Sequence, residues 1–357
     1  MASPAATTAT TAPAGRKAWA ALVTRPTYLP GLLALHRTLV SVSSYPLVVL
    51  VTDALPESAR AIIRKRGLEV IDIEHLSPGE GKHSGFDGDK AHRFHDTWTK
   101  LQVFGLDQFE RLILIDADTI FLRGMDELFD IELGKDWIAA APVCACNPFK
   151  FAHYPDDWVP ANCALSHQPR PTTLDNVPQP TLDSPRTSHL LNSGVVVLHP
   201  SRELMDTLVD HLDNSPTIAE AQFPDQDVLA EVFKGKWRVL PWWTNSLKTE
   251  RAVHQNIWDD NEVRLLHFIL EKPWNKRPAG LPERSVLPTP PRSPADGVRR
   301  PLPAPLLEAV HSAPPQPSKT DYDILHSWWW AVYDDLLAEL KTEAGSGWEE
   351  IDRYVAH

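Results

Sequence analysis

RLILIDADTIFL, at residues 111–122, begins with an apolar run that ends in two carboxylates separated by a single residue. An unbroken apolar run of this length predicts a strand buried on both faces of a sheet. Side chains alternate along an extended chain, so Asp116 and Asp118 point to the same side and can share one divalent cation, while Ala117 points into the fold. An Asp-x-Asp pair also occurs at ordinary strand-to-turn boundaries, so the motif by itself does not exclude a turn with no metal site.

Strand and helix patterns alternate before this stretch. Apolar runs predict strands, and apolar residues at helical spacing predict helices. Strands that alternate with helices form a parallel sheet, whose binding crevice lies at the carboxyl ends of the strands. The sequence therefore predicts an α/β fold with a mainly parallel sheet. The predicted strands span residues 18–24, 47–53 and 69–73, and the predicted helices span 28–42, 56–66 and 89–109.

Two proline-rich segments interrupt the rest of the chain. Residues 144–188 contain eight prolines and no periodic pattern, which indicates a long insertion. A disordered segment is open, but the aromatic residues of its first half favour an anchored lid or acceptor-side loop. Residues 278–317 contain twelve prolines, which indicates a linker or a strap on the surface. Around these segments we predict strands at 137–141, 190–198, 237–243 and 263–268, and helices at 201–213, 225–233 and 321–341.

These patterns divide the chain into four parts. We expect a flexible tail at 1–16, one domain at 17–277, a linker or strap at 278–318 and a helical extension at 319–357. The last helix carries Trp328, Trp329 and Trp330. A tryptophan cluster at helical spacing is typical of a core-packing face, and we favour that interpretation over a sugar-stacking platform.

Composition excludes several classes of protein. The formal net charge of −12 argues against general binding of nucleic acid or of anionic membranes. We find no apolar run of the roughly 20 residues that a membrane span needs and no signal-peptide pattern, so we expect a soluble, cytoplasmic protein. Cys144, Cys146 and Cys163 form no C-x-x-C pair, so we expect reduced thiols and neither a disulfide framework nor a zinc ribbon. The oligomeric state is left open.

A cation held by two carboxylates needs further ligands. His267 ends a predicted strand and is the candidate third ligand. Lys272 follows five residues later, where an ammonium could bind a diphosphate that also contacts the metal. A lone histidine is usually structural, so His267 by itself is weak support for a metal site.

Four ordered motifs resemble the glycogenin and galactinol synthase group of glycosyltransferase family 8. They are Asp116-Ala117-Asp118, Asn192-Ser193-Gly194, Asp225-Gln226 and the segment HFILEKPW at 267–274. The resemblance covers residues 17–274 and implies a single-domain GT-A fold, Mn²⁺ (or Mg²⁺) as cofactor, and a UDP-sugar donor. It also implies transfer to a hydroxyl acceptor with retention of the anomeric configuration, the leaving phosphate helping to deprotonate the acceptor.

The resemblance also assigns roles to individual residues. The metal ligands would be Asp116, Asp118 and His267. The diphosphate would be bound by Lys272, and the uridine by Thr24 and by Tyr28 through stacking. The donor sugar and reacting carbon would be contacted by Asn192, Ser193, Asp225 and Gln226. Lys100 matches the lysine of a family Thr-Lys-Leu motif, and Arg93 matches an upstream arginine with a small shift in register.

The sequence departs from the glycogenin pattern at two places. A glycine and one more residue are expected between His267 and Lys272, but residues 269–271 are Ile-Leu-Glu, so we expect an altered turn there. Residues 244–260, which match the self-glucosylated region of glycogenin, contain no tyrosine. A separate acceptor is therefore favoured, and its identity and that of the donor sugar are left open.

Two alternatives compete with a transferase. The stretch also fits the D-x-D-x-T signature of haloacid dehalogenase-like phosphatases, with Asp116 as nucleophile, Asp118 as acid/base and Thr119 in place. That signature normally follows the first strand, whereas three predicted strands precede it here. The other alternative is a non-catalytic protein that binds a nucleotide-sugar or a partner, but the retention of all the expected site residues disfavours it.

Overall fold

The computed structural model describes residues 15–83, 96–152, 154–181, 183–281 and 301–357. Within these residues, seven strands form one sheet and three short strands form a second. The predictions for tail residues 1–14, helix residues 89–95 and strap residues 282–300 lie outside the described residues.

The larger sheet is mainly parallel, which confirms the predicted α/β class. Its strands are β1 (Lys17–Leu22), β2 (Leu47–Val51), β3 (Glu69–Asp72), β4 (Arg111–Ile115), β6 (Ile138–Pro142), β7 (Leu191–Leu198) and β8 (Trp237–Val239). They lie in the order β3-β2-β1-β4-β7-β6-β8. β7 runs antiparallel to both of its neighbours, and every other pairing in the sheet is parallel.

Helices cover both faces of this sheet. The helices are α1 (Leu29–Val42), α2 (Glu57–Lys65), α4 (Arg202–Asn214), α5 (Pro224–Val232), α6 (Glu250–Val253), α7 (Ala304–His311), α8 (Asp323–Thr342) and α9 (Trp348–Asp352), with a 3₁₀ helix at Thr97–Gly105. Trp19 and Ile113 pack into the core beneath α1 and α2. Ala20 and Leu114, the next residues along the same strands, pack into the core beneath α4 and α5. Burial on both faces explains why these strands are unbroken apolar runs.

The strand predicted to end at the two carboxylates is confirmed, and a second, unpredicted strand follows them. β4 ends at Ile115, and β5 (Thr119–Phe121) pairs with β10 (Leu265–His267) in the second sheet, where β10 also pairs with β9 (Ser246–Leu247). Gly31 of α1 lies beneath the intervening turn, where a Cβ atom would come within 2.6 Å of the Ala117 carbonyl oxygen. The two carboxylates therefore lie where the two sheets meet.

Other boundaries agree with the predictions in part. The strands predicted at 137–141 and 190–198 are confirmed as β6 and β7. Ser201 accepts a hydrogen bond from the Leu204 amide at 3.2 Å and caps α4, as expected. The strand predicted at 237–243 ends at Val239, because residues 242–244 form a 3₁₀ turn. The described end of the helix predicted at 89–109 is likewise 3₁₀.

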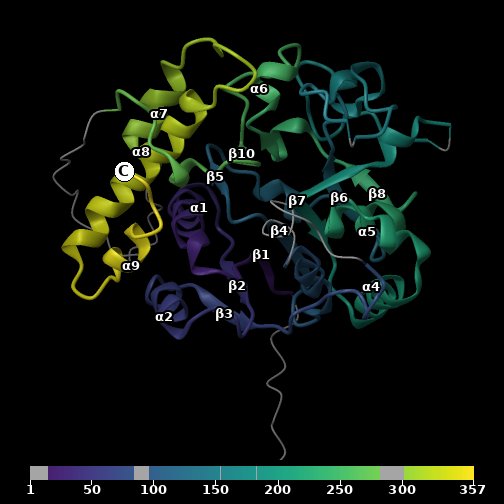
Figure 1. Cartoon of the computed structure of the whole chain (residues 1–357), viewed down its shortest axis with the longest axis horizontal. Coiled ribbons are helices and arrows are strands. Elements are labelled where there is room, and N and C mark those ends of the chain that lie inside the picture. The colour runs from purple at the N-terminus through teal and green to yellow at the C-terminus, as the bar shows by residue number, and fades with distance from the viewer. Residues whose placement is uncertain (1–14, 84–95, 153, 182, 282–300) are drawn as a thin grey trace, which may run out of the picture.

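α8 and α9 pack against α1, and α7 packs against α8; Figure 1 shows the three C-terminal helices grouped together. Trp328, Trp329 and Trp330 are fully buried in the same core as α1, so the core-packing interpretation is confirmed. An ion pair of 3.0 Å joins Arg37 of α1 to Asp335 of α8. α7 also shows that the described part of the proline-rich strap is partly helical.

Candidate active site

A cavity of about 300 Å³ opens at the carboxyl ends of β1 and β4. The sequence predicts the binding crevice at this edge. The cavity is lined by eleven of the twelve predicted site residues, namely Thr24, Tyr28, Lys100, Asp116, Asp118, Asn192, Ser193, Asp225, Gln226, His267 and Lys272. The twelfth, Arg93, lies outside the described residues.

Asp116, Asp118 and His267 converge in this cavity. The Nε2 atom of His267 lies 3.5 Å from Oδ2 of Asp116 and 3.5 Å from Oδ1 of Asp118. All three ligand atoms lie within 4.8 Å of one another, which is close enough for one cation to contact each of them. Asp118 and His267 are buried, so a cation here would be largely screened from water.

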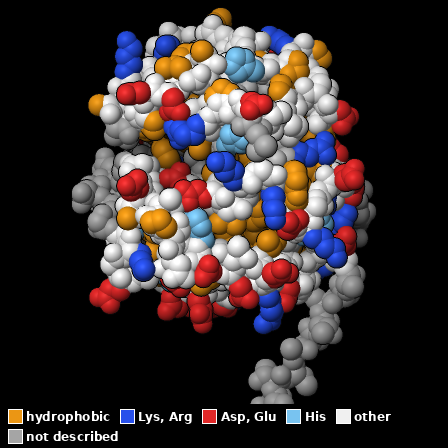
Figure 2. Space-filling view, turned by 90° about the vertical axis from the view of Figure 1, so that its right-hand side faces the viewer, with side chains coloured by type: hydrophobic (Ala, Val, Ile, Leu, Met, Phe, Trp, Pro, Cys, Tyr) orange, Lys and Arg blue, Asp and Glu red, His pale blue; other side chains and the backbone are white. Residues whose placement is uncertain are grey.

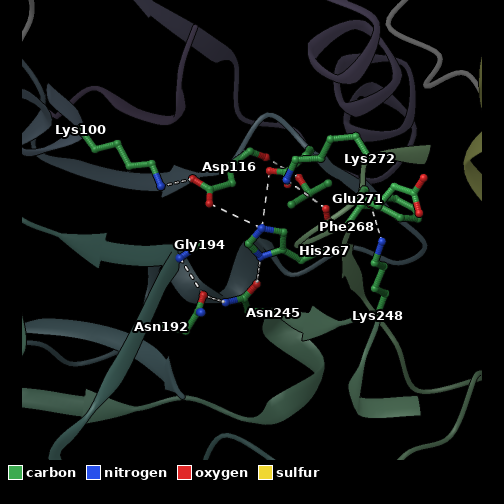
Figure 3. Close-up of polar contacts among 12 residues, drawn as sticks. Lys100, Asp116, Asn192, Gly194, Asn245, Lys248, His267, Phe268, Glu271 and Lys272 are labelled. Carbon is green, nitrogen blue, oxygen red and sulfur yellow. Dashed lines mark hydrogen bonds and ion pairs between the residues drawn. The ribbon is translucent and has the colours of Figure 1, made fainter. Parts of the chain in front are cut away.

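A chain of amides sets the orientation of His267 (Figure 3). Its Nδ1 atom lies 2.9 Å from Oδ1 of Asn245, and an amide oxygen only accepts, so Nδ1 carries the hydrogen. The lone pair of Nε2 then faces the two carboxylates, as a metal ligand requires. Asn245 in turn donates to Oδ1 of Asn192 at 2.7 Å, and that oxygen also accepts from the Gly194 amide at 2.9 Å. Sequence reasoning missed Asn245, which lies in no motif.

Two half-buried lysines flank the carboxylates (Figure 3). Lys100 lies 2.6 Å from Asp116 and 3.5 Å from Asp225. Burial lowers the pKa of Lys100, but the two carboxylates outweigh it and raise that pKa. Lys272 pairs with Asp118 and donates to the Phe268 carbonyl. Burial raises the pKa of Asp118, but Lys272 and His267 outweigh it, and the net pKa is lowered.

Asp225 and Gln226 enter the cavity from the first turn of α5 and are both buried. Burial raises the pKa of Asp225, and the charge of Lys100 opposes that effect. The carboxylate of Asp225 therefore lies apart from the Asp116 and Asp118 pair. Lys100 lies between them and pairs with both Asp116 and Asp225. This arrangement can hold a cation on one side and a polar or developing positive centre on the other.

Thr24 and Tyr28 form another part of the cavity wall. The Thr24 hydroxyl donates to Asp96 at 2.8 Å, and Arg25 lies 3.2 Å from the same carboxylate. The Tyr28 ring packs edge-on against Trp274, with ring centroids 5.6 Å apart. Sequence reasoning missed Asp96, which falls in a segment expected to be an ordinary helix.

The loop between His267 and Lys272 contains a residue with positive φ that is not glycine. Leu270 adopts a left-handed backbone conformation with φ of 64°. Glycine takes this conformation freely, whereas a residue with a side chain is disfavoured by about 1–2 kcal/mol. The chain therefore keeps a glycine-like turn beside the cavity without a glycine.

Aromatic side chains of the insertion form the opposite wall. The cavity is lined there by Phe149, Phe151, Tyr154 and Trp158. The Trp158 ring stacks on Phe223, with centroids 6.1 Å apart and planes 8° apart. The insertion is thus part of the site rather than a remote loop.

This chain belongs to glycosyltransferase family 8. The model of that family, described as "Glycosyl transferase family 8", matches residues 20–277. The chain is therefore a glycosyltransferase, and its sheet arrangement is the GT-A type. Membership also decides against the phosphatase alternative, in agreement with a D-x-D motif that follows the fourth strand rather than the first.

Its relatives are distant in sequence. The chain is 26% identical to galactinol synthase 1 of Solanum lycopersicum over 250 residues, covering 69% of this chain and 70% of that one. It is 25% identical to uncharacterized protein R707 of Acanthamoeba polyphaga mimivirus over 253 residues, covering 70% and 79%. A crystal structure of the galactosyltransferase LgtC with donor and acceptor sugar analogs is similar with a TM-score of 0.49 and 16% identity, covering 72% and 89%.

The surface charges and the helices bear on the expectations drawn from composition. On the face shown in Figure 2, lysine and arginine side chains are interspersed with acidic ones and form no continuous basic patch. Among the helices that the structure describes, none has the length and apolar character needed to cross a membrane.

Proposed function

We propose that this chain is a Mn²⁺-dependent, retaining hexosyltransferase that moves a hexose from a UDP-sugar to a hydroxyl group of a separate acceptor. The observation that carries the proposal is the convergence of Asp116, Asp118 and His267 beside Lys272 in one cavity. Family membership gives the reaction class, and this cluster supports a donor that carries a diphosphate.

The ligand set suits the cation. Two carboxylate oxygens and one imidazole nitrogen fit Mn²⁺, with Mg²⁺ as the second candidate. When bound, the metal acts as a Lewis acid that stabilises negative charge on the departing diphosphate. Asn245 holds His267 in the tautomer that presents Nε2. Lys272, which pairs with Asp118 in this structure, is placed to turn toward the diphosphate and neutralise it.

The remaining residues position the donor and the acceptor. Tyr28 stacks on the uracil and Thr24 binds the nucleoside. The donor sugar is held by Lys100, Asn192, Ser193, Asp225 and Gln226, and Arg93 remains a further predicted contact. The bond between the sugar and UDP breaks, the acceptor oxygen forms the new bond on the same face, and its proton passes to the leaving phosphate. Asp225 and Gln226 stabilise the oxocarbenium-like centre.

The aromatic wall of the insertion supports an acceptor site. Tyr154 and Trp158 offer large, partly apolar faces to the cavity. Sugars and cyclic polyols present C–H faces that pack on such rings. Some curated relatives carry the name galactinol synthase, so polyols belong among the acceptors to be tested.

The test is a UDP-release screen. The purified chain is incubated with Mn²⁺ and UDP-glucose or UDP-galactose, each with polyols, sugars, lipids or no added acceptor. We expect UDP release that depends on both Mn²⁺ and one acceptor class. Asp116→Ala combined with Asp118→Ala should abolish it, while Asp53→Ala, at an exposed carboxylate outside the cavity, should not.

Three results would contradict the proposal in different ways. Phosphate release from a phosphatase substrate without UDP formation would restore the phosphatase alternative. UDP-sugar binding without turnover on any acceptor would favour the non-catalytic alternative. Glycosylation of the chain itself would contradict the separate acceptor.

A further inference from the structure

Three cysteines and one histidine meet at the base of the insertion. Cys144 and Cys146 follow β6, Cys163 lies between two 3₁₀ turns of the insertion, and His254 directly follows α6. The Nε2 atom of His254 lies 3.1 Å from the sulfur of Cys144, 3.6 Å from that of Cys146 and 3.8 Å from that of Cys163. All four atoms lie within 4.8 Å of one another.

The three sulfur–nitrogen separations are close to the corresponding edges of a tetrahedron around zinc. Zn–S bonds of about 2.3 Å and Zn–N bonds of about 2.0 Å place sulfur about 3.5 Å from nitrogen and sulfurs about 3.8 Å apart. Three thiols and one imidazole form a closed set of four ligands, which is the Cys₃His type of structural site. Cys146, Cys163 and His254 are buried, and Cys144 is half-buried.

We propose that Cys144, Cys146, Cys163 and His254 bind one structural Zn²⁺ ion, which fastens the insertion to the sheet and to α6. Zinc binds thiolates, so loading the site releases the three thiol protons, and no oxidant or reductant is needed. The ligands span residues 144–254, and closing so long a loop with a metal restricts the unfolded chain strongly. In Figure 1 the insertion (teal) lies near α6 at the top of the molecule.

This site is separate from the proposed Mn²⁺ site but adjoins the same cavity. Cys144 is among the cavity-lining residues, as are Tyr154 and Trp158 of the insertion. A zinc ion at Cys144 would therefore hold the aromatic wall in place without contacting the donor. The two sites also differ in ligand type, because thiolates select zinc, whereas a site with two carboxylates suits Mn²⁺. The proposal stands whether or not the UDP-sugar assignment is correct.

The experiment measures metal in the full chain. Protein produced with zinc in the medium is dialysed and analysed by inductively coupled plasma mass spectrometry. We expect one zinc per chain in the wild type and its loss in Cys163→Ser. The matched control is Asp116→Asn combined with Asp118→Asn, which removes the other candidate metal site and should retain the zinc.

A second measurement on the wild type keeps the test decisive if Cys163→Ser fails to fold. Chelator-treated protein is titrated with Co²⁺, which should produce the intense absorption of tetrahedral thiolate-bound cobalt. Zn²⁺ should bleach that absorption and protect all three thiols from a thiol reagent. Wild-type protein that contains no zinc, gives no cobalt–thiolate absorption and reacts equally with and without Zn²⁺ would overturn the proposal. An intact mass showing a disulfide among these cysteines would overturn it too.

Discussion

Lys248 is a buried lysine whose removal should change how stability depends on pH. It follows β9 and has no solvent exposure. Its Nζ atom lies 3.0 Å from Nε2 of His326, donates to the Glu271 carbonyl and lies 4.4 Å from the centre of the Tyr322 ring. Burial and then the charge of Lys272 lower the pKa of Lys248 to about 7, although Glu271 and Asp118 act in the opposite direction.

The sign and size of the effect follow from that pKa. Between pH 7 and 10.5, Lys248 is mostly neutral in the folded chain and protonated in the unfolded chain, so the unfolded state binds more protons. Its contribution to the free energy of unfolding therefore rises with pH across this window. The fall from 10.5 to about 7 corresponds to at most about 5 kcal/mol, and about 3 kcal/mol of it falls between pH 7 and 9.5.

The perturbation is Lys248→Met, which keeps the length of the side chain and removes the titration. Urea unfolding followed by tryptophan fluorescence, at several pH values from 7 to 9.5, gives the free energy of unfolding of both proteins. We expect wild type to gain about 3 kcal/mol relative to Lys248→Met over this range. The matched control, Lys135→Met at an exposed lysine, should follow wild type. Parallel profiles for wild type and Lys248→Met would refute the reasoning.

Four further predictions concern the site and the core. Asp118→Asn should lower kcat/KM for the UDP-sugar by about 100-fold and weaken Mn²⁺ binding in a titration, since it removes a buried charged ligand. Gly194→Ala would place a Cβ atom 2.5 Å from Cε1 of His267, so Mn²⁺ affinity should fall while Gly79→Ala, with 3.4 Å to its nearest neighbour, leaves it unchanged. Leu270→Gly should leave stability equal or raise it by up to about 1 kcal/mol in urea, and a clear loss would contradict the strain at φ of 64°. Trp329→Ala, at a fully buried ring, should cost about 3–5 kcal/mol by the same assay, and a loss below about 1 kcal/mol would contradict its core role.

Much of the fold could be predicted because its strands are buried on both faces. β2 is apolar throughout and β4 is apolar after Arg111, and such runs carry their signal locally. The periodic apolar pattern of α8 likewise predicted a helix that packs in a core. Four short motifs in order predicted the family because each contributes residues to one cavity.

The second strand, β5, could not be predicted in the same way. Both sides of Asp116-Ala117-Asp118 are apolar, so the local pattern is continuous. The chain changes sheets there because β5 pairs with β10, which lies far along the sequence. The residues of β5 themselves do not indicate a pairing partner so distant in the sequence.

The Asp116 and Asp118 pair was thus determined by the sequence alone, since two carboxylates one residue apart at the end of an apolar run carry their own signal. What surrounds the pair was decided by tertiary structure: Asn245 that orients His267, Lys248 beside His326, and the cysteine cluster completed by His254. In each case the side chains come from segments distant in the sequence. Their chemistry depends on distances of 3–4 Å that only the packed sheets and the docked insertion create.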